Sequence, residues 1–211
     1  MKKILVVGTG GLAREFTSWF GDSHEILGYF STNLVEHAQF NLPGVLHSGS
    51  ITPQSVGTDL VAVAIGTPTV KALMYEQLTQ LGFQFPIFTH ASSTVSSVAT
   101  LQDGVIVSPH CVVSPNVKLQ KLAYLNFGCG VGHDAQVGSF TQINPGAQLG
   151  GFTNIGAQTL IGSGATILQG VTIGANATVA SGSVVFAKVA DGATVMGNPA
   201  KRMRAFENGP A

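Results

Sequence analysis

Apolar side chains between residues 95 and 185 recur at every sixth position, with no insertion anywhere in the run. Four positions after most of them comes a small or β-branched residue, and glycine fills many of the positions between. The aliphatic positions are Val95, Leu101, Val107, Val113, Leu119, Leu125, Val131, Val137, Ile143, Leu149, Ile155, Ile161, Ile167, Ile173, Val179 and Val185. A period of six is neither the period of an α-helix nor the alternation of an isolated hairpin, and it predicts a parallel β-helix of hexapeptide repeats.

The period also predicts the dimensions of this β-helix. If three six-residue segments make one triangular coil, each coil advances the chain by one strand spacing, about 4.8 Å. Five such coils give a prism roughly 24 Å tall with the aliphatic side chains stacked inside. Because only its two ends carry unpaired backbone groups, we expect other parts of the chain to cover them.

The first 88 residues follow a different pattern, in which short apolar runs alternate with helical stretches. We expect strands at residues 2–8, 26–30, 60–65 and 85–88, and helices at residues 12–20 and 69–81. This alternation predicts a small parallel α/β domain of Rossmann type. After the repeats, residues 187–194 leave the register, and we expect a tail with a short helix reaching Phe206. The predicted units are therefore residues 1–88, 89–186 and 187–211.

A glycine-rich turn from Gly8 to Ala13 reads G-x-G-x-x-A, a near match to the dinucleotide-binding fingerprint. Glycines at these positions let the backbone approach a diphosphate at a helix N-terminus, although a tight strand-to-helix turn uses the same residues. A nicotinamide site would need an acidic residue after the second strand, where Ser31, Thr32 and Asn33 stand instead. The turn therefore favours a nucleotide diphosphate over a nicotinamide cofactor.

The composition of the chain argues against nucleic acid and membranes as binding partners. The chain has 211 residues, a formal net charge of zero and 9% charged residues, so it lacks the basic field that nucleic-acid binding needs. Its longest purely apolar run, residues 60–65, is too short to span a membrane, and we expect a cytoplasmic protein without a signal peptide. Cys111 and Cys129 are eighteen residues apart, and we expect reduced, buried neighbours in adjacent coils.

His133 is the strongest candidate for chemistry among the six histidines. It lies in a glycine-flanked turn and is followed directly by Asp134, and Gly151 occupies the equivalent point of the next coil. An imidazole beside an exposed backbone N–H suits acyl transfer, because the ring takes a proton while the amide holds an oxyanion. The alternative is a solvated histidine in a surface turn.

Several motifs taken together resemble the bacterial sugar acyltransferases that join a Rossmann-like domain to a left-handed β-helix. This family includes sialic acid O-acetyltransferases and nucleotide-amino-sugar N-acetyltransferases, and the left hand is what the resemblance implies. The motifs that carry it are Gly8-Thr-Gly-Gly11, Ala64-Ile-Gly66, Thr89-His-Ala-Ser92, Val131-Gly-His-Asp134, Ile143-Asn-Pro-Gly-Ala147 and Gly197-Asn-Pro-Ala-Lys201.

The resemblance implies acetyl-CoA bound between neighbouring subunits of a trimer, with His133 as general base and Asp134 increasing its basicity. It also implies a cofactor contact at the Gly151 amide, with Ser163 and Ser181 along the CoA. Gln142 stands where the family commonly has a second histidine near the acetyl-CoA. The implied nucleotide-sugar site comprises Gly10, Gly11, Leu12, Ser31, Thr32 and Gly66.

We therefore expect a homotrimeric acetyl-CoA-dependent acyltransferase that N-acetylates a nucleotide-linked amino sugar for surface-glycan synthesis. O-acetylation of a sugar hydroxyl, as in the sialic-acid type, would use the same base and remains open. A non-catalytic trimeric scaffold that binds a sugar nucleotide is the alternative outside enzymes. We expect no metal, because a zinc site needs closely spaced partners that His110 and His133 lack.

Overall fold

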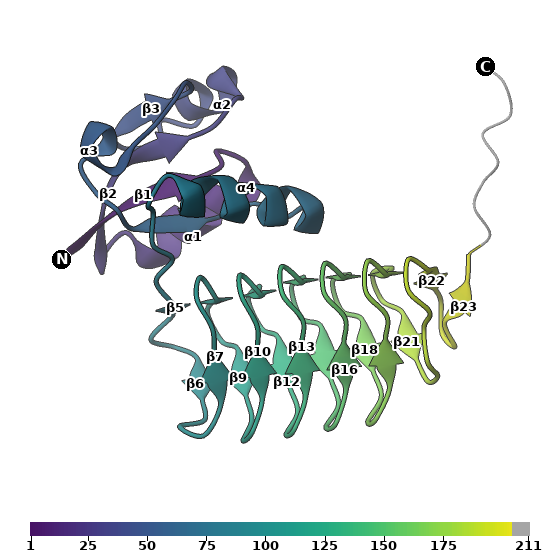
Figure 1. The fold of residues 1–211 in the computed structure, drawn as a ribbon. Helices are drawn as coiled ribbons and strands as arrows, with labels where there is room; N and C mark the ends of the chain where they lie inside the picture. The colour runs from purple at the N-terminus through teal and green to yellow at the C-terminus, as the bar shows by residue number, and fades with distance from the viewer. Residues whose placement is uncertain (204–211) are drawn as a thin grey trace, which may run out of the picture.

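The computed structural model describes residues 1–203, which form an α/β domain joined to a long prism of parallel strands (Figure 1). The α/β domain alternates strand and helix throughout. Its elements are β1 (Lys2–Val7), α1 (Gly11–Phe20), β2 (His24–Phe30), α2 (Leu34–Gln39), β3 (Val45–His47), α3 (Pro53–Val56), β4 (Val61–Val63) and α4 (Pro68–Gln80).

The four strands of this domain form one parallel sheet in the order β3-β2-β1-β4. Central β1 is buried from Ile4 to Val7, which explains its uninterrupted apolar sequence. The sheet order and the helices between the strands are compatible with a Rossmann-like domain. The fourth strand expected at residues 85–88 is wrong, because these residues lie outside this sheet and its fourth strand is β3, at the edge next to β2.

The prism has three faces, each a stack of short strands, and up to β21 these strands have two residues and follow one another on a face every eighteen residues. The first face contains β5 (Phe88–Thr89), β8 (Ile106–Val107), β11 (Tyr124–Leu125), β14 (Gln142–Ile143), β17 (Leu160–Ile161), β20 (Thr178–Val179), β22 (Thr194–Met196) and β23 (Lys201–Arg202). The second face contains β6 (Thr94–Val95), β9 (Val112–Val113), β12 (Gly130–Val131), β15 (Gln148–Leu149), β18 (Thr166–Ile167) and β21 (Val184–Val185). The third contains β7 (Thr100–Leu101), β10 (Lys118–Leu119), β13 (Gln136–Val137), β16 (Asn154–Ile155) and β19 (Thr172–Ile173).

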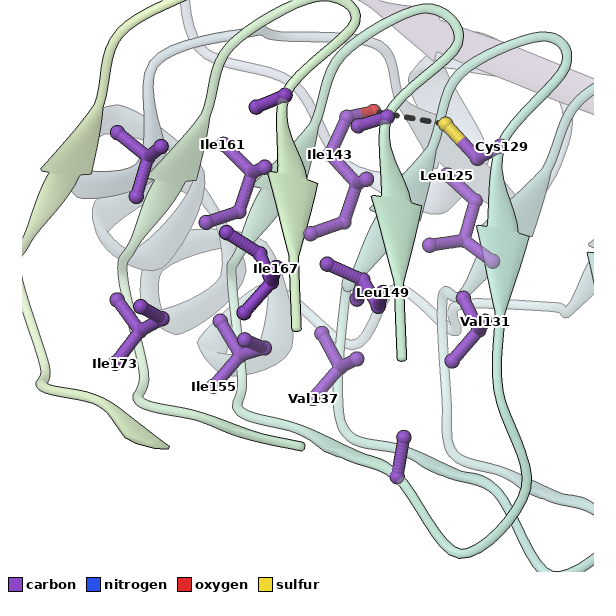
Figure 2. Packing of buried hydrophobic residues seen from close by; sticks show 14 of the residues in the cluster. Leu125, Cys129, Val131, Val137, Ile143, Leu149, Ile155, Ile161, Ile167 and Ile173 are labelled. Carbon is purple, nitrogen blue, oxygen red and sulfur yellow. Dashed lines mark hydrogen bonds between the residues drawn. The ribbon is translucent and has the colours of Figure 1, made fainter. Parts of the chain in front are cut away.

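The aliphatic ladder fills the interior of the prism, as the six-residue period predicts (Figure 2). Residues eighteen apart pair directly, for example Val131 with Leu149 and Leu149 with Ile167. Cys111 and Cys129 are buried and free in adjacent coils, as expected, and each thiol lies near a backbone carbonyl of the following coil. These parallel sheets and repeats fit a left-handed β-helix.

The prism continues past residue 186, where the sequence analysis expected its end. Thr178 pairs with Thr194, so this last coil takes sixteen residues instead of eighteen, and Val189 and Val195 join the buried ladder. Residues 201–202 form β23, antiparallel to β22, where a short helix was expected. Phe206 lies outside the described residues.

The α/β domain packs on the first coils of the prism through α1 and α4 (Figure 1). Phe16 and Phe20 of α1 share a cluster with Phe88 and Tyr124, and Leu78 of α4 shares one with Leu122. This packing buries the first face of the prism near the domain. The second and third faces and the corner between them remain uncovered by it.

Candidate active site

His133 lies at a corner of the prism, in the turn from β12 on the second face to β13 on the third. The following residue, Asp134, has φ +61°, the left-handed conformation that turns the chain through the corner and that Asp tolerates better than most residues. About half of the histidine side chain is exposed (53%), so a substrate can reach it. The prediction of a turn position for His133 is confirmed.

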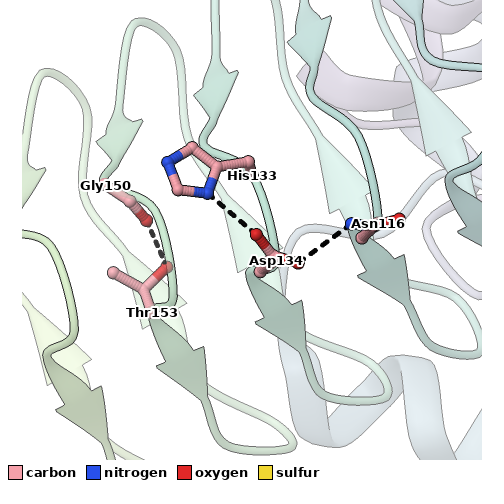
Figure 3. A network of polar contacts seen from close by, with 5 residues as sticks. All are labelled: Asn116, His133, Asp134, Gly150 and Thr153. Carbon is pink, nitrogen blue, oxygen red and sulfur yellow. Dashed lines mark hydrogen bonds and ion pairs between the residues drawn. The ribbon is translucent and has the colours of Figure 1, made fainter.

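A chain of hydrogen bonds fixes the imidazole (Figure 3). His133 Nδ1 lies 2.8 Å from Asp134 Oδ2, and Asn116 Nδ2 donates to Asp134 Oδ1 at 3.0 Å. These two hydrogen bonds, that of His133 first, lower the pKa of the Asp134 carboxyl. An ionised carboxylate only accepts, so Nδ1 carries the ring proton and the lone pair of Nε2 is free to take one.

Gly151 leaves room for this imidazole in the next coil. A Cβ on Gly151 would lie 2.7 Å from His133 Nε2, a distance that would force the ring to move. The Gly151 N–H donates to no acceptor within residues 1–203. Phe152 packs its ring edge-to-face on the imidazole at 5.0 Å. The arrangement combines an imidazole whose Nε2 is free, an unengaged amide donor and an aromatic side chain.

Ser163 and Ser181 lie on the opposite edge of the second face from His133. Both serines precede strands of that face, β18 and β21, whereas His133 and Gly151 follow strands of it, β12 and β15. The two serines are exposed and occupy adjacent coils, since Gly182 N donates to Ser163 O at 2.8 Å. One chain therefore does not bring its serine edge to its histidine corner.

Gln142 does not belong to this site, and the sequence analysis was wrong to place it near the cofactor. Its strand β14 is on the first face, under α4, and the residue is 1% exposed. Its Oε1 accepts from Nζ of Lys71, a residue of α4, at 3.1 Å. The glutamine serves the contact between the two parts of the chain.

The residues of the expected nucleotide-sugar site gather at one edge of the α/β sheet. Gly10 and Gly11 follow β1, Ser31 and Thr32 follow β2, and Gly66 follows β4. These are the carboxyl ends of neighbouring parallel strands, and the strand order reverses between β1 and β4. In open α/β sheets this reversal point is the usual place for a ligand. Leu12 differs, because its side chain packs against the domain core.

Two residues at this edge were missed by the sequence analysis. Thr9 is buried, and its Oγ1 lies 2.9 Å from Glu36 Oε2 and 3.1 Å from Ser31 Oγ. Glu36 belongs to α2, a helix that the sequence analysis did not expect. No fixed spacing links it to the glycine turn, so only the folded chain brings the two together. Asn116, in contrast, is eighteen residues before Asp134 and was predictable from the period.

Neither a metal cluster nor a membrane span is found in residues 1–203. No group of three or more His, Cys, Asp or Glu side chains there could hold a metal ion. None of the helices in this part of the chain has both the length and the apolar character needed to cross a membrane.

The fold and the repeat define the class of the chain. Residues 152–187 match the model of the Bacterial transferase hexapeptide (six repeats) family. Together with the structural matches below, this confirms the resemblance to sugar acyltransferases with a left-handed β-helix and supports an acyltransferase with hexapeptide repeats in residues 152–187.

Several solved structures match nearly the whole chain. The acetyltransferase domain of PglB from Neisseria gonorrhoeae is 26% identical, with 96% of this chain and 100% of that chain covered and a TM-score of 0.71. PerB from Caulobacter crescentus, solved with CoA and GDP-perosamine, is 22% identical over 97% and 98%, with a TM-score of 0.73. WeeI from Acinetobacter baumannii is 23% identical over 96% and 100%, with a TM-score of 0.79.

Proposed function

We propose that the chain is an acetyl-CoA-dependent N-acetyltransferase acting in the cytoplasm on a nucleotide-linked amino sugar, with His133 as general base. The observation that carries the proposal is the corner itself: an imidazole with free Nε2, oriented by Asp134 and facing Gly151. The PglB domain has also been solved with acetyl coenzyme A, and PerB with CoA and GDP-perosamine, which supports this donor and this acceptor class.

In this mechanism the chain supplies a base and an oxyanion donor. His133 Nε2 takes a proton from the acceptor amine as its nitrogen forms a bond to the acetyl carbonyl carbon. The Gly151 N–H donates to the carbonyl oxygen as negative charge develops there. The C–S bond then breaks, and the departing thiolate receives the proton held on His133 Nε2, so that the products are the amide and free CoA and the imidazole is neutral again.

We further propose that each site is shared between two copies in a cyclic trimer. The histidine corner and the serine edge border the same face from opposite sides, so neighbouring copies can place one of each against a single CoA. Ser163 and Ser181 stand one above the other along the prism axis, which suits an extended pantetheine. In this proposal the α/β domain binds the sugar nucleotide, and the prism, which begins at β5 and continues to β22, carries out the acyl transfer.

The direct test is release of free thiol from acetyl-CoA with a panel of nucleotide-linked amino sugars. We expect turnover with at least one amine and a kcat about 10²- to 10⁴-fold lower in His133→Ala, the usual contribution of a general base. The thermal midpoint should change little, because about half of this side chain is exposed and it lies outside the buried aliphatic ladder. Acetylation only of sugars that lack an amine would instead establish O-acetylation, and no turnover with any sugar would indicate a binding scaffold.

A wild-type kcat in a folded His133→Ala variant would contradict the assigned base. His110→Ala is the matched control, because His110 is also a histidine in a turn that follows a strand of the prism, yet lies at a different corner. We expect His110→Ala to retain wild-type turnover.

A further inference from the structure

The carboxylate of Glu36 lies beside the glycine turn that follows β1. Glu36 Oε2 lies 3.9 Å from the position that a Cβ on Gly10 would occupy, beside the first residues of α1. Gly66, across the same edge, has open space where its Cβ would stand. The carboxylate therefore stands at the open side of the turn, where the sequence alone favoured a diphosphate.

Hydrogen bonds within the edge hold one carboxylate oxygen of Glu36 and leave the other unengaged. Since an ionised carboxylate only accepts, the Thr9 hydroxyl donates to Glu36 Oε2, and the Ser31 hydroxyl can donate to Thr9 in turn. Among residues 1–203, Thr9 is the one donor to this carboxylate, and no cation there forms an ion pair with it. Glu36 is half-buried, so its side chain is held within the edge and is still partly open to solvent.

A carboxylate at this position favours binding of the nucleoside of a nucleotide over binding of its diphosphate. It repels a diphosphate at short range, whereas it accepts strong hydrogen bonds from a hydroxyl or an N–H group. In dinucleotide-binding folds a carboxylate after the second strand holds a ribose, and this chain has Ser31 and Thr32 there instead. Glu36 brings a carboxylate to the same edge from α2.

We propose that Glu36 is a specificity-determining residue that accepts a hydrogen bond from the nucleoside of the acceptor, either a ribose hydroxyl or a base N–H. The nucleoside then occupies the glycine turn, and the diphosphate lies away from the N-terminus of α1. The inference rests on the proposed nucleotide-sugar acceptor and gives the orientation of that acceptor. It differs from the expectation that the turn holds the diphosphate.

The direction in which Glu36→Gln changes the affinity for nucleotides tests this orientation. Glutamine keeps an oxygen that accepts from Thr9, so a purely structural role for Glu36 would survive the change, while the negative charge is lost. We expect UDP, GDP or dTDP, whichever the wild-type protein binds, to bind Glu36→Gln about 10- to 100-fold more weakly in calorimetry, the loss typical of a hydrogen bond to a charged group. Glu76→Gln, on the exposed side of α4, is the matched control and should bind normally.

An increase in the nucleotide affinity of Glu36→Gln would overturn the proposal. If the diphosphate occupied the turn, removing the carboxylate would tighten the binding of these nucleotides and of inorganic pyrophosphate. Equal or tighter nucleotide binding by Glu36→Gln therefore contradicts the role of Glu36 and leaves the proposed acetyl transfer standing. Absence of binding to any nucleoside diphosphate by the wild-type protein contradicts the nucleotide acceptor itself, and this inference with it.

Deoxy analogues separate the two donor groups. Weaker wild-type binding of the 2′-deoxy or 3′-deoxy form, with no further loss in Glu36→Gln, identifies a ribose hydroxyl as the partner. If the full effect of Glu36→Gln persists with both deoxy forms, the partner is a base N–H.

Discussion

At the scale of single residues, the site depends on what adjacent coils place beside His133. Asp134 fixes the proton on Nδ1, Gly151 leaves the space that the ring occupies, and Asn116 holds Asp134 in turn. Asp134 is the residue after His133, Gly151 comes eighteen residues after His133, and Asn116 comes eighteen residues before Asp134. A strictly periodic backbone therefore assembles the group without a long-range loop.

Phe152 provides a test of how the imidazole is positioned. It has φ +58°, a conformation that costs a residue other than glycine roughly 1–2 kcal/mol, and its ring packs on His133. Phe152→Gly removes both the strain and the ring. We expect its free energy of unfolding to stay within about 1 kcal/mol of the wild type, because relief of strain offsets the greater freedom of the unfolded chain. Its kcat should fall about 3- to 10-fold as the base loses its orientation.

Gln158→Gly is the matched control for this variant. Gln158 has φ +54° at another corner of the prism, so glycine gives the same backbone relief there without touching the imidazole. Circular dichroism melts and steady-state kinetics on the two variants check the prediction. Equal kcat values for both glycine variants and the wild type would show that the Phe152 ring does not position His133.

At the scale of elements, helix α4 fixes the α/β domain to the prism through a buried lysine. Lys71 is 0% exposed, and its Nζ donates to Thr141 O at 3.2 Å and to Gln142 Oε1 at 3.1 Å, with Leu122 O at 3.4 Å. Burial lowers the pKa of the Lys71 amine to about 7. No carboxylate within residues 1–203 forms an ion pair with it.

This lysine predicts how stability depends on pH. The ordinary pKa of 10.5 applies in the unfolded chain, so between pH 7 and 10.5 the unfolded state binds a proton that the folded state does not. The free energy of unfolding should therefore gain up to ~1.4 kcal/mol per pH unit across this window from Lys71 alone. Below pH 7 both states hold the proton, and this contribution no longer changes.

Lys71→Met removes the titrating group and nearly keeps the side-chain length. Denaturant unfolding at several pH values should show the wild type gaining stability relative to Lys71→Met from pH 7 to 10. Parallel stability curves over that range would mean that the Lys71 amine is not desolvated as the structure shows.

The elements also show what the sequence could predict and what it could not. The prism was predictable because its repeat sets every inward position. Helices α1 and α4 were predictable because each is a stretch of ten or more residues that follows an apolar strand. Strand β3 and helices α2 and α3 were missed because they are three to six residues long, too short for a period to show. Their structure depends on tertiary pairing, as does the position of Glu36.

Site residues divide in the same way. His133, Asp134 and Gly151 were placed together correctly because they share a coil or lie eighteen residues apart. Ser163 lies thirty residues after His133, which is not a multiple of eighteen, and the period therefore already places it at a different corner. Gln142 was misplaced because the period shows only which face of the prism a residue belongs to. It does not show that α4, which lies elsewhere in the sequence, covers that face.

At the scale of the whole molecule, the proposed acyl transfer requires neighbouring copies of the chain. The second face separates the histidine corner from the serine edge within one chain, and acyl transfer needs both the base and a bound CoA. In a cyclic trimer every interface is the same and joins two different surfaces, so one copy contributes the corner and the next contributes the edge. We therefore expect three equivalent sites, each made from two chains.

Complementation between two inactive variants is the measurement that tests this account most directly. His133→Ala removes the base, and the double variant Ser163→Trp with Ser181→Trp blocks the exposed serine edge, so each should be inactive alone. In trimers formed by co-expressing both in equal amounts, an interface works only when the blocked chain supplies His133 and the alanine chain supplies the serine edge. Random assembly then restores about a quarter of wild-type turnover. Turnover that stays at the level of the separate variants, in mixed trimers verified by mass, would contradict a site shared between copies.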